Sequence, residues 1–182
     1  MGSTLHTSDT EGWTIERFLI PINFAPQILY NGVEDIRFTP GWAKPQSDDY
    51  WSYAFLWYLD GKPQIDANTI ASNLKAYYTG LIRINTESSK VPDAQIVVTT
   101  RFDAVATGAG DASTYSGTIT MLDFMQLKPI TLNCIVHVKP CSASDKAVLF
   151  YELSPQPFTH KVWESLSQLW IGFSCLKTDA QK

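Results

Sequence analysis

The sequence predicts an α+β fold, with a single antiparallel sheet of about six to eight strands flanked by two main helices. Residues 50–59, YWSYAFLWYL, form its most aromatic run, and both faces of that run are apolar, as in a strand covered on both sides. Several β-branched runs separated by short turns follow in the second half. Two other segments, at about 66–82 and 160–171, repeat apolar residues at helical spacing.

The N-terminal third predicts two strands and a long loop. Residues 13–21 read as a strand closed by proline, and the Asn31-Gly32 turn leads into a second strand at 33–38. Residues 39–49 hold two prolines and a glycine, which oppose regular pairing, with Trp42 in their middle. The run at 50–59 follows as the central strand and ends at Asp60-Gly61.

Each predicted helix has an apolar stripe and a candidate cap. The first stripe is Ile70, Leu74, Tyr77, Tyr78 and Leu81. Asp66 is its expected N-cap, and Gly80 is a candidate stop. The last stripe is Val162, Trp163, Leu166, Leu169 and Trp170. We expect Thr159 to cap that helix and Gly172 to end it.

The strands expected between the helices lie at 94–102, 115–123, 130–138 and 147–153, joined as a meander. Gly108-Ala109-Gly110 reads as part of a hairpin loop rather than a phosphate-binding loop, because no strand-to-helix turn surrounds it. At the level of layout only, the arrangement resembles the Mog1/PsbP-like α/β/α sandwich, in which an early strand ending in proline leads into such a sheet. That resemblance implies a fold and no site residues.

Composition limits the function classes. We expect residues 1–12 to be a disordered leader and 13–178 a single globular domain, given 45% apolar and 18% charged residues in the chain. We expect no nucleic-acid partner, because the net charge is −4 and no basic run is present. No segment has the length of a membrane span. A bacterial periplasmic or secreted protein, with Met1-Gly2-Ser3 replacing a removed signal, is favoured over a cytoplasmic one.

Few residues carry a pattern for catalysis or metal binding. His137 is the one candidate acid or base, in a hydrolase-type site completed by Asp123, Asp103 or Glu152, although a lone strand histidine is more often structural. Adjacent carboxylates occur at 34–35 and 48–49; the first two would face opposite sides of a strand. We predict no metal and no cofactor, and we favour a protein that is not an enzyme.

The cysteines predict one disulfide. Cys141 and Cys175 each follow an expected element, where the backbone can adapt to a bridge, whereas Cys134 lies inside a strand and reads as a small buried hydrophobe. Outside the cytoplasm, we expect a Cys141–Cys175 bridge that fastens the last helix to the sheet.

The favoured function is a binding or interaction module for a small ligand, a sugar or a partner protein. Trp42 and Tyr50 flank the proline-containing loop, and aromatic side chains placed in this way stack on ligands. The competing interpretation is that Trp42 folds back over the core as a cover. Homodimerisation through a sheet edge is left open.

Overall fold

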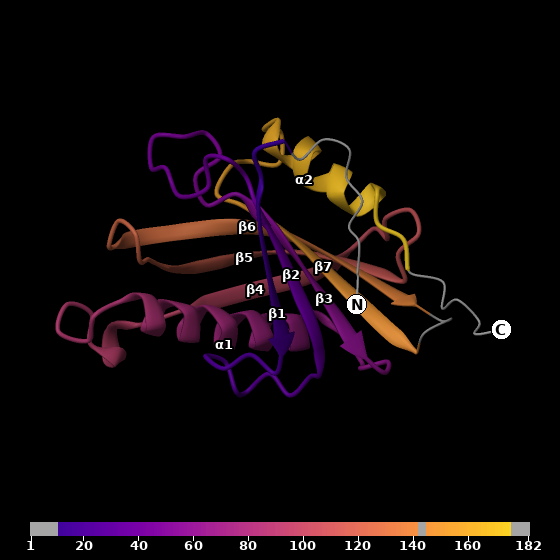
Figure 1. The fold of residues 1–182 in the computed structure, drawn as a ribbon, viewed down its shortest axis with the longest axis horizontal. Helices are drawn as coiled ribbons and strands as arrows, with labels where there is room; N and C mark the ends of the chain where they lie inside the picture. Colours follow the sequence, from indigo (N-terminus) through magenta and orange to yellow (C-terminus); the bar gives the residue numbers. More distant parts are fainter. Residues whose placement is uncertain (1–10, 142–144, 176–182) are drawn as a thin grey trace.

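The structure is a computed structural model that describes residues 11–141 and 145–175. These residues form one antiparallel sheet of seven strands, two α-helices and a short 3-10 helix (Figure 1). The elements are β1 (Thr14–Ile20), β2 (Gly32–Phe38), β3 (Tyr53–Asp60), α1 (Ala67–Asn85), η1 (Asp93–Gln95), β4 (Thr99–Val105), β5 (Ser113–Asp123), β6 (Lys128–Cys141), β7 (Lys146–Ser154) and α2 (Val162–Ile171). The predicted α+β class is confirmed. The expected leader at 1–12 lies outside the described residues except for Glu11 and Gly12.

The sheet is built from two meanders that meet at β3 and β7. The strand order is β1-β2-β3-β7-β6-β5-β4, and every neighbouring pair is antiparallel. The chain runs through β1, β2 and β3, and α1 then carries it to β4 at the far edge. From there β5, β6 and β7 return toward the centre, as the predicted meander requires. The two helices cover opposite faces of the sheet (Figure 1).

The predicted central strand is confirmed as an interior strand, with a later start. In β3, Phe55 and Trp57 join the core beneath α1, while Ala54 and Leu56 join the core beneath α2. Residues 50–52 are not part of it, because Trp51 has a left-handed backbone with φ of 54°. The turn is held by the Trp51 N–H, which donates to the Trp42 carbonyl at 2.8 Å.

The first helix begins as predicted and ends later. Asp66 Oδ1 accepts a hydrogen bond from the Thr69 N–H at 2.7 Å, which caps α1. Gly80 does not stop the helix, which continues to Asn85. A glycine is needed here because the segment that contains Phe24 packs closely across α1. A Cβ at Gly80 would lie 1.9 Å from the carbonyl oxygen of Phe24.

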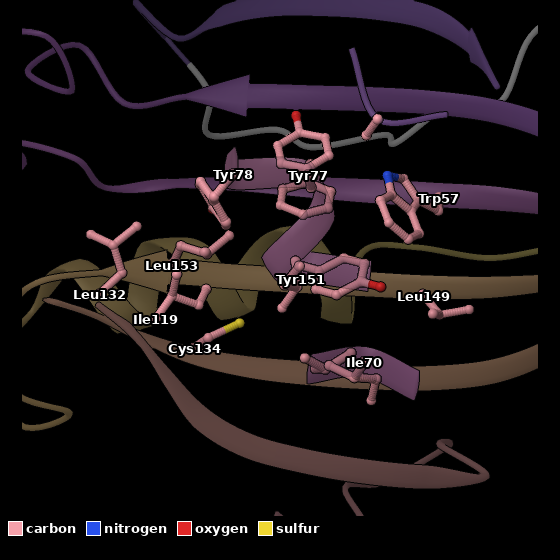
Figure 2. Close-up of a cluster of buried hydrophobic side chains, with 14 of the residues drawn as sticks. Trp57, Ile70, Tyr77, Tyr78, Ile119, Leu132, Cys134, Leu149, Tyr151 and Leu153 are labelled. Carbon is pink, nitrogen blue, oxygen red and sulfur yellow. The ribbon is translucent and has the colours of Figure 1, made fainter. Parts of the chain in front are cut away.

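The last helix spans 162–171, and Thr159 is not its cap. The Val162 N–H instead donates to His160 Nδ1 at 3.2 Å. The predicted stripe faces the sheet, where Leu166 and Trp170 pack against Leu56 and Phe150. On the other face, Tyr151 of β7 lies among Trp57 and the tyrosines of α1 (Figure 2). Cys134 is buried in that same core.

A disulfide joins the end of β6 to the segment after α2. Cys141 and Cys175 are bonded, with 5.6 Å between their Cα atoms. The bond closes a separation of 34 residues, so it restricts the unfolded chain considerably. Among the described residues, no helix combines the length and the apolar character that a bilayer span requires.

We expect the change Gly80→Ala to lower the free energy of unfolding by about 1–3 kcal/mol, because the added methyl group meets a backbone oxygen that cannot move aside. In an unconstrained helix the same change would instead stabilise by about 1 kcal/mol. Urea denaturation of G80A, with the exposed Ser72→Ala on the same helix as control, measures the sign. A more stable G80A would contradict the close approach of Phe24.

Removing the disulfide through the double change Cys141→Ser and Cys175→Ser should cost about 3–4 kcal/mol of stability by the loop-entropy relation. Mass measurement after alkylation, with and without reductant, first establishes the bond in the purified protein. Three alkylated thiols without reductant would refute it, and Cys134→Ser serves as the control for a buried cysteine outside the bridge.

Candidate functional site

A cavity of about 460 Å³ lies between α1 and the β1–β3 end of the sheet. Its walls come from β1, β2 and the start of β3, from α1, from the segment after β1, from the loop between β2 and β3, and from Phe124 after β5. Those walls include Phe18, Phe24, Glu34, Phe38, Trp42, Trp51, Tyr53, Tyr77 and Leu81. The cavity is therefore mostly aromatic and apolar, with a carboxyl group in its lining.

Trp42 forms one wall of this cavity. Its ring stacks on Phe38 with 4.3 Å between ring centroids, and it lies in a T-shaped arrangement with Tyr53, with 6.5 Å between centroids. The side chain is partly buried, so it covers the core and lines the cavity at the same time. The ring therefore lies over the core, as the second interpretation of the sequence expects, while its place in the cavity wall leaves ligand binding as a proposal.

Trp51 holds its place in the cavity wall at a conformational cost. A bulky residue with φ of 54° lies in a region that costs on the order of 1–3 kcal/mol, and such strain gathers at functional sites. Its buried indole N–H makes no hydrogen bond of normal geometry within the described residues. It does lie close enough to the Tyr50 hydroxyl to lower the pKa of that group slightly, against a larger rise from burial.

Glu34 is the buried carboxyl group of the cavity. It is 1% exposed, and its Oε1 accepts a hydrogen bond from Trp57 Nε1 at 3.1 Å. Burial raises its pKa from 4.5 to about 7, and repulsion from Glu16 adds to the rise. Hydrogen bonds from Trp57 and Tyr77 lower the pKa but do not offset burial. Glu34 therefore exchanges a proton near neutral pH, which is a property of groups at binding and catalytic sites.

Tyr50, the second predicted ligand-binding residue, does not line this cavity. Its hydroxyl donates to Asp123 Oδ2 at 2.5 Å, and burial together with that carboxylate raises its pKa. Asp123 Oδ1 also accepts a bond from the Met125 N–H at 2.8 Å. Tyr50 thus ties the loop that carries Trp42 to the end of β5.

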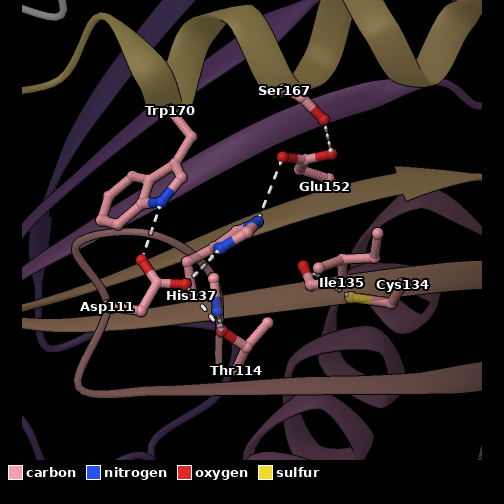
Figure 3. A network of polar contacts seen from close by, with 9 residues as sticks. Asp111, Thr114, Cys134, Ile135, His137, Glu152, Ser167 and Trp170 are labelled. Carbon is pink, nitrogen blue, oxygen red and sulfur yellow. Dashed lines mark hydrogen bonds and ion pairs between the residues drawn. The ribbon is translucent and has the colours of Figure 1, made fainter. Parts of the chain in front are cut away.

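His137 lies on the opposite face of the sheet, beneath α2 (Figure 3). Its Nδ1 is 2.7 Å from Asp111 Oδ2, and its Nε2 is 3.2 Å from Glu152 Oε1, although this second contact lacks the alignment of a hydrogen bond. The imidazole is 14% exposed, and both carboxylates are fully covered. Burial lowers the pKa of His137, but the two carboxylates outweigh it and raise the pKa above 6.5.

Further hydrogen bonds connect this cluster to α2. Trp170 Nε1 donates to Asp111 Oδ1 at 2.9 Å, and Ser167 Oγ donates to Glu152 Oε2 at 3.0 Å. The ring of Trp170 also stacks on His137 (Figure 3). The carboxylates of Asp111 and Glu152 therefore connect α2 to the strand and hairpin beneath it.

The structure brings His137 to one of its three predicted partners. Glu152 is beside it, whereas Asp123 bonds Tyr50 and Asp103 lies on the edge strand β4. Asp111, in the β4–β5 hairpin, was not expected, because a loop residue has no periodicity that would place it. A general base needs a lone pair that faces its substrate. Both nitrogens of His137 face carboxylates, so the contacts lend no support to a hydrolase site.

Metal ligands do not converge in the described part of the chain. No group of three His, Cys, Asp or Glu side chains there is arranged to hold an ion. Asp111 and Glu152 sit at opposite nitrogens of the His137 ring rather than around a common point. Comparisons of the chain with models of protein families, with curated proteins and with solved structures found no match.

We expect NMR titration of the His137 imidazole to give a pKa above 6.5. A raised histidine pKa contributes stability that is fully present below pH 6.5 and is lost as the pH rises through the raised value. His137→Gln should therefore cost about 3–5 kcal/mol at pH 6, where it leaves two buried carboxylates without their cation, and less at pH 9. Urea unfolding of H137Q and of the wild-type protein across this range measures the difference. A difference that does not fall between pH 6 and pH 9 would count against the charged cluster.

Proposed function

We propose that this chain is a non-catalytic binding module that holds a small, largely apolar ligand in the cavity between α1 and the β1–β3 end of the sheet. The observation that carries the proposal is the cavity itself, about 460 Å³ of mostly aromatic lining around a buried carboxyl group. Small-molecule sites typically combine a volume of this order with a few polar groups that orient the ligand.

The lining favours a small apolar molecule over a sugar. A sugar presents hydroxyl groups on most of its surface, and it needs many polar partners besides an aromatic platform. The described lining offers two carboxyl groups, on Glu16 and Glu34, and two amides, on Asn23 and Asn85, among apolar and aromatic residues. At the rim, Leu19 and Ile84 are 78% and 60% exposed, which gives an apolar ligand a favourable entrance.

We also propose that the protein works in an oxidising compartment, as a periplasmic or secreted protein does. The bond between Cys141 and Cys175 supports this location, since stable disulfides are rare in the reducing cytoplasm.

Titration with N-phenyl-1-naphthylamine, a neutral apolar fluorophore, tests the binding function. We expect saturable binding at one site, and Trp42→Ala should weaken it roughly tenfold because it removes one apolar wall. Leu81→Trp should also reduce binding, because it fills the cavity from α1.

The matched control is Trp13→Ala, which makes the same truncation on the α2 side of the sheet. It should leave the affinity for the fluorophore unchanged. If the wild-type protein showed no saturable binding, or if W13A and W42A weakened it equally, the cavity would not be the site.

A further inference from the structure

We propose that the ligand of this cavity is a small organic cation, with an apolar body and a protonated amine or quaternary ammonium group that pairs with the carboxylate of Glu34. This inference rests on the binding function proposed above and names the chemical class of the ligand.

The charges around the cavity are all of one sign. Among the described residues that line it, Glu16 and Glu34 are acidic, and none is Lys, Arg or His. The two carboxyl groups come from neighbouring strands, because Glu16 of β1 pairs with Ile36 and Glu34 of β2 pairs with Phe18. Glu16 is exposed and Glu34 is buried, so one carboxylate meets the entering cation and the other receives it.

The aromatic walls suit the same charge. Faces of tryptophan and tyrosine rings attract cations through their quadrupoles, most strongly where water is excluded. One cavity is lined by Trp42 from the β2–β3 loop, Tyr53 from β3 and Tyr77 from α1. Aromatic side chains combined with a carboxylate form the usual environment for a bound ammonium group.

Glu34 lacks a cationic partner in the described protein. Its neighbours are neutral polar groups or another acid: Trp57 and Tyr53 from β3, Tyr77 from α1, Tyr151 from β7 and Glu16 from β1. The neighbouring buried carboxylate of Asp35, by contrast, has such a partner, because it accepts a bond from Arg37 Nε at 2.7 Å. A bound cation would supply at Glu34 the charge that the protein supplies at Asp35.

A proton balance follows from this pairing. Without ligand, Glu34 has a pKa of about 7 and is partly protonated at neutral pH. A cation binds the carboxylate form, so binding lowers the pKa and releases the proton to solvent. The affinity for a cation should therefore rise with pH up to about 7 and level off above it, falling by up to about tenfold per pH unit below.

Three probes of similar shape differ in charge: 2-phenylethylammonium is a cation, 2-phenylethanol is neutral and phenylacetate is an anion. Each has a phenyl ring on a short chain. Their displacement of N-phenyl-1-naphthylamine from the full chain is measured at pH 8. We expect the cation to bind at least tenfold more tightly than the alcohol, and phenylacetate to bind most weakly. Calorimetry of the cation in two buffers of different ionisation enthalpy, at pH 6.5, should show release of a proton.

Glu34→Gln is the matched variant, since it keeps the shape of the side chain and removes the charge. It should bind the cation and the alcohol within about threefold of each other and abolish the pH dependence, while Glu16→Gln should keep most of the preference. Should E34Q fail to fold, the probe series and the proton release in the wild-type protein still decide.

The outcomes also distinguish this inference from the proposed function. If the fluorophore binds but the cation shows no preference over the alcohol, or phenylacetate binds best, the ligand is not a cation and the binding function stands. If neither the fluorophore nor any probe binds, the binding function itself fails.

Discussion

Burial of β3 on both faces is the constraint on which the rest of the structure depends. A strand with apolar side chains on both sides needs one layer above it and another below, and α1 and α2 supply them. Its register then places two carboxyl groups on opposite faces. Glu34 pairs with Trp57, whose indole donates to it, and Glu152 pairs with Ala54, whose small side chain leaves room beneath α2. The positions of both carboxyl groups thus follow from one strand.

The two buried carboxyl groups differ in how they are satisfied. Glu152 accepts a bond from Ser167 and faces the His137 imidazole, so it has a basic partner within the protein, which it shares with Asp111. Among the described residues, Glu34 has only neutral polar groups and a second acid nearby, so burial raises its pKa to about 7 and it is partly protonated at neutral pH. The contact of Glu152 with His137 stabilises the packing of α2 on the sheet. Glu34 has no such partner among the described residues, which is why we place the proposed binding site at its cavity rather than at His137.

Local patterns predicted the elements well and the site poorly. The alternation of Phe55, Leu56 and Trp57 gave both faces of β3 correctly, because facing on a strand depends only on sequence position. For the same reason, sequence position alone predicts that Glu34 and Asp35 point to opposite faces of the sheet. Their burial could not be predicted in this way, because it depends on α1 and on β1, which covers the edge of β2. The turn at Trp51 was missed because its aromatic neighbours favour a strand. Only the contact with Trp42 across the loop reveals it.

Preorganisation explains why a binding role suits this cavity. The loop that carries Trp42 is held at several points: the Trp51 N–H donates to the Trp42 carbonyl, Thr39 Oγ1 donates to the Ser52 carbonyl at 2.9 Å, and Tyr50 donates to Asp123. A ligand that enters therefore does not have to order this wall, because the conformational entropy of the loop is lost during folding rather than on binding. The strained backbone of Trp51 is likewise set during folding, because the surrounding contacts maintain it whether or not a ligand is bound. Affinity in such a site comes from the match of charge and shape, and loop closure is not needed to obtain it.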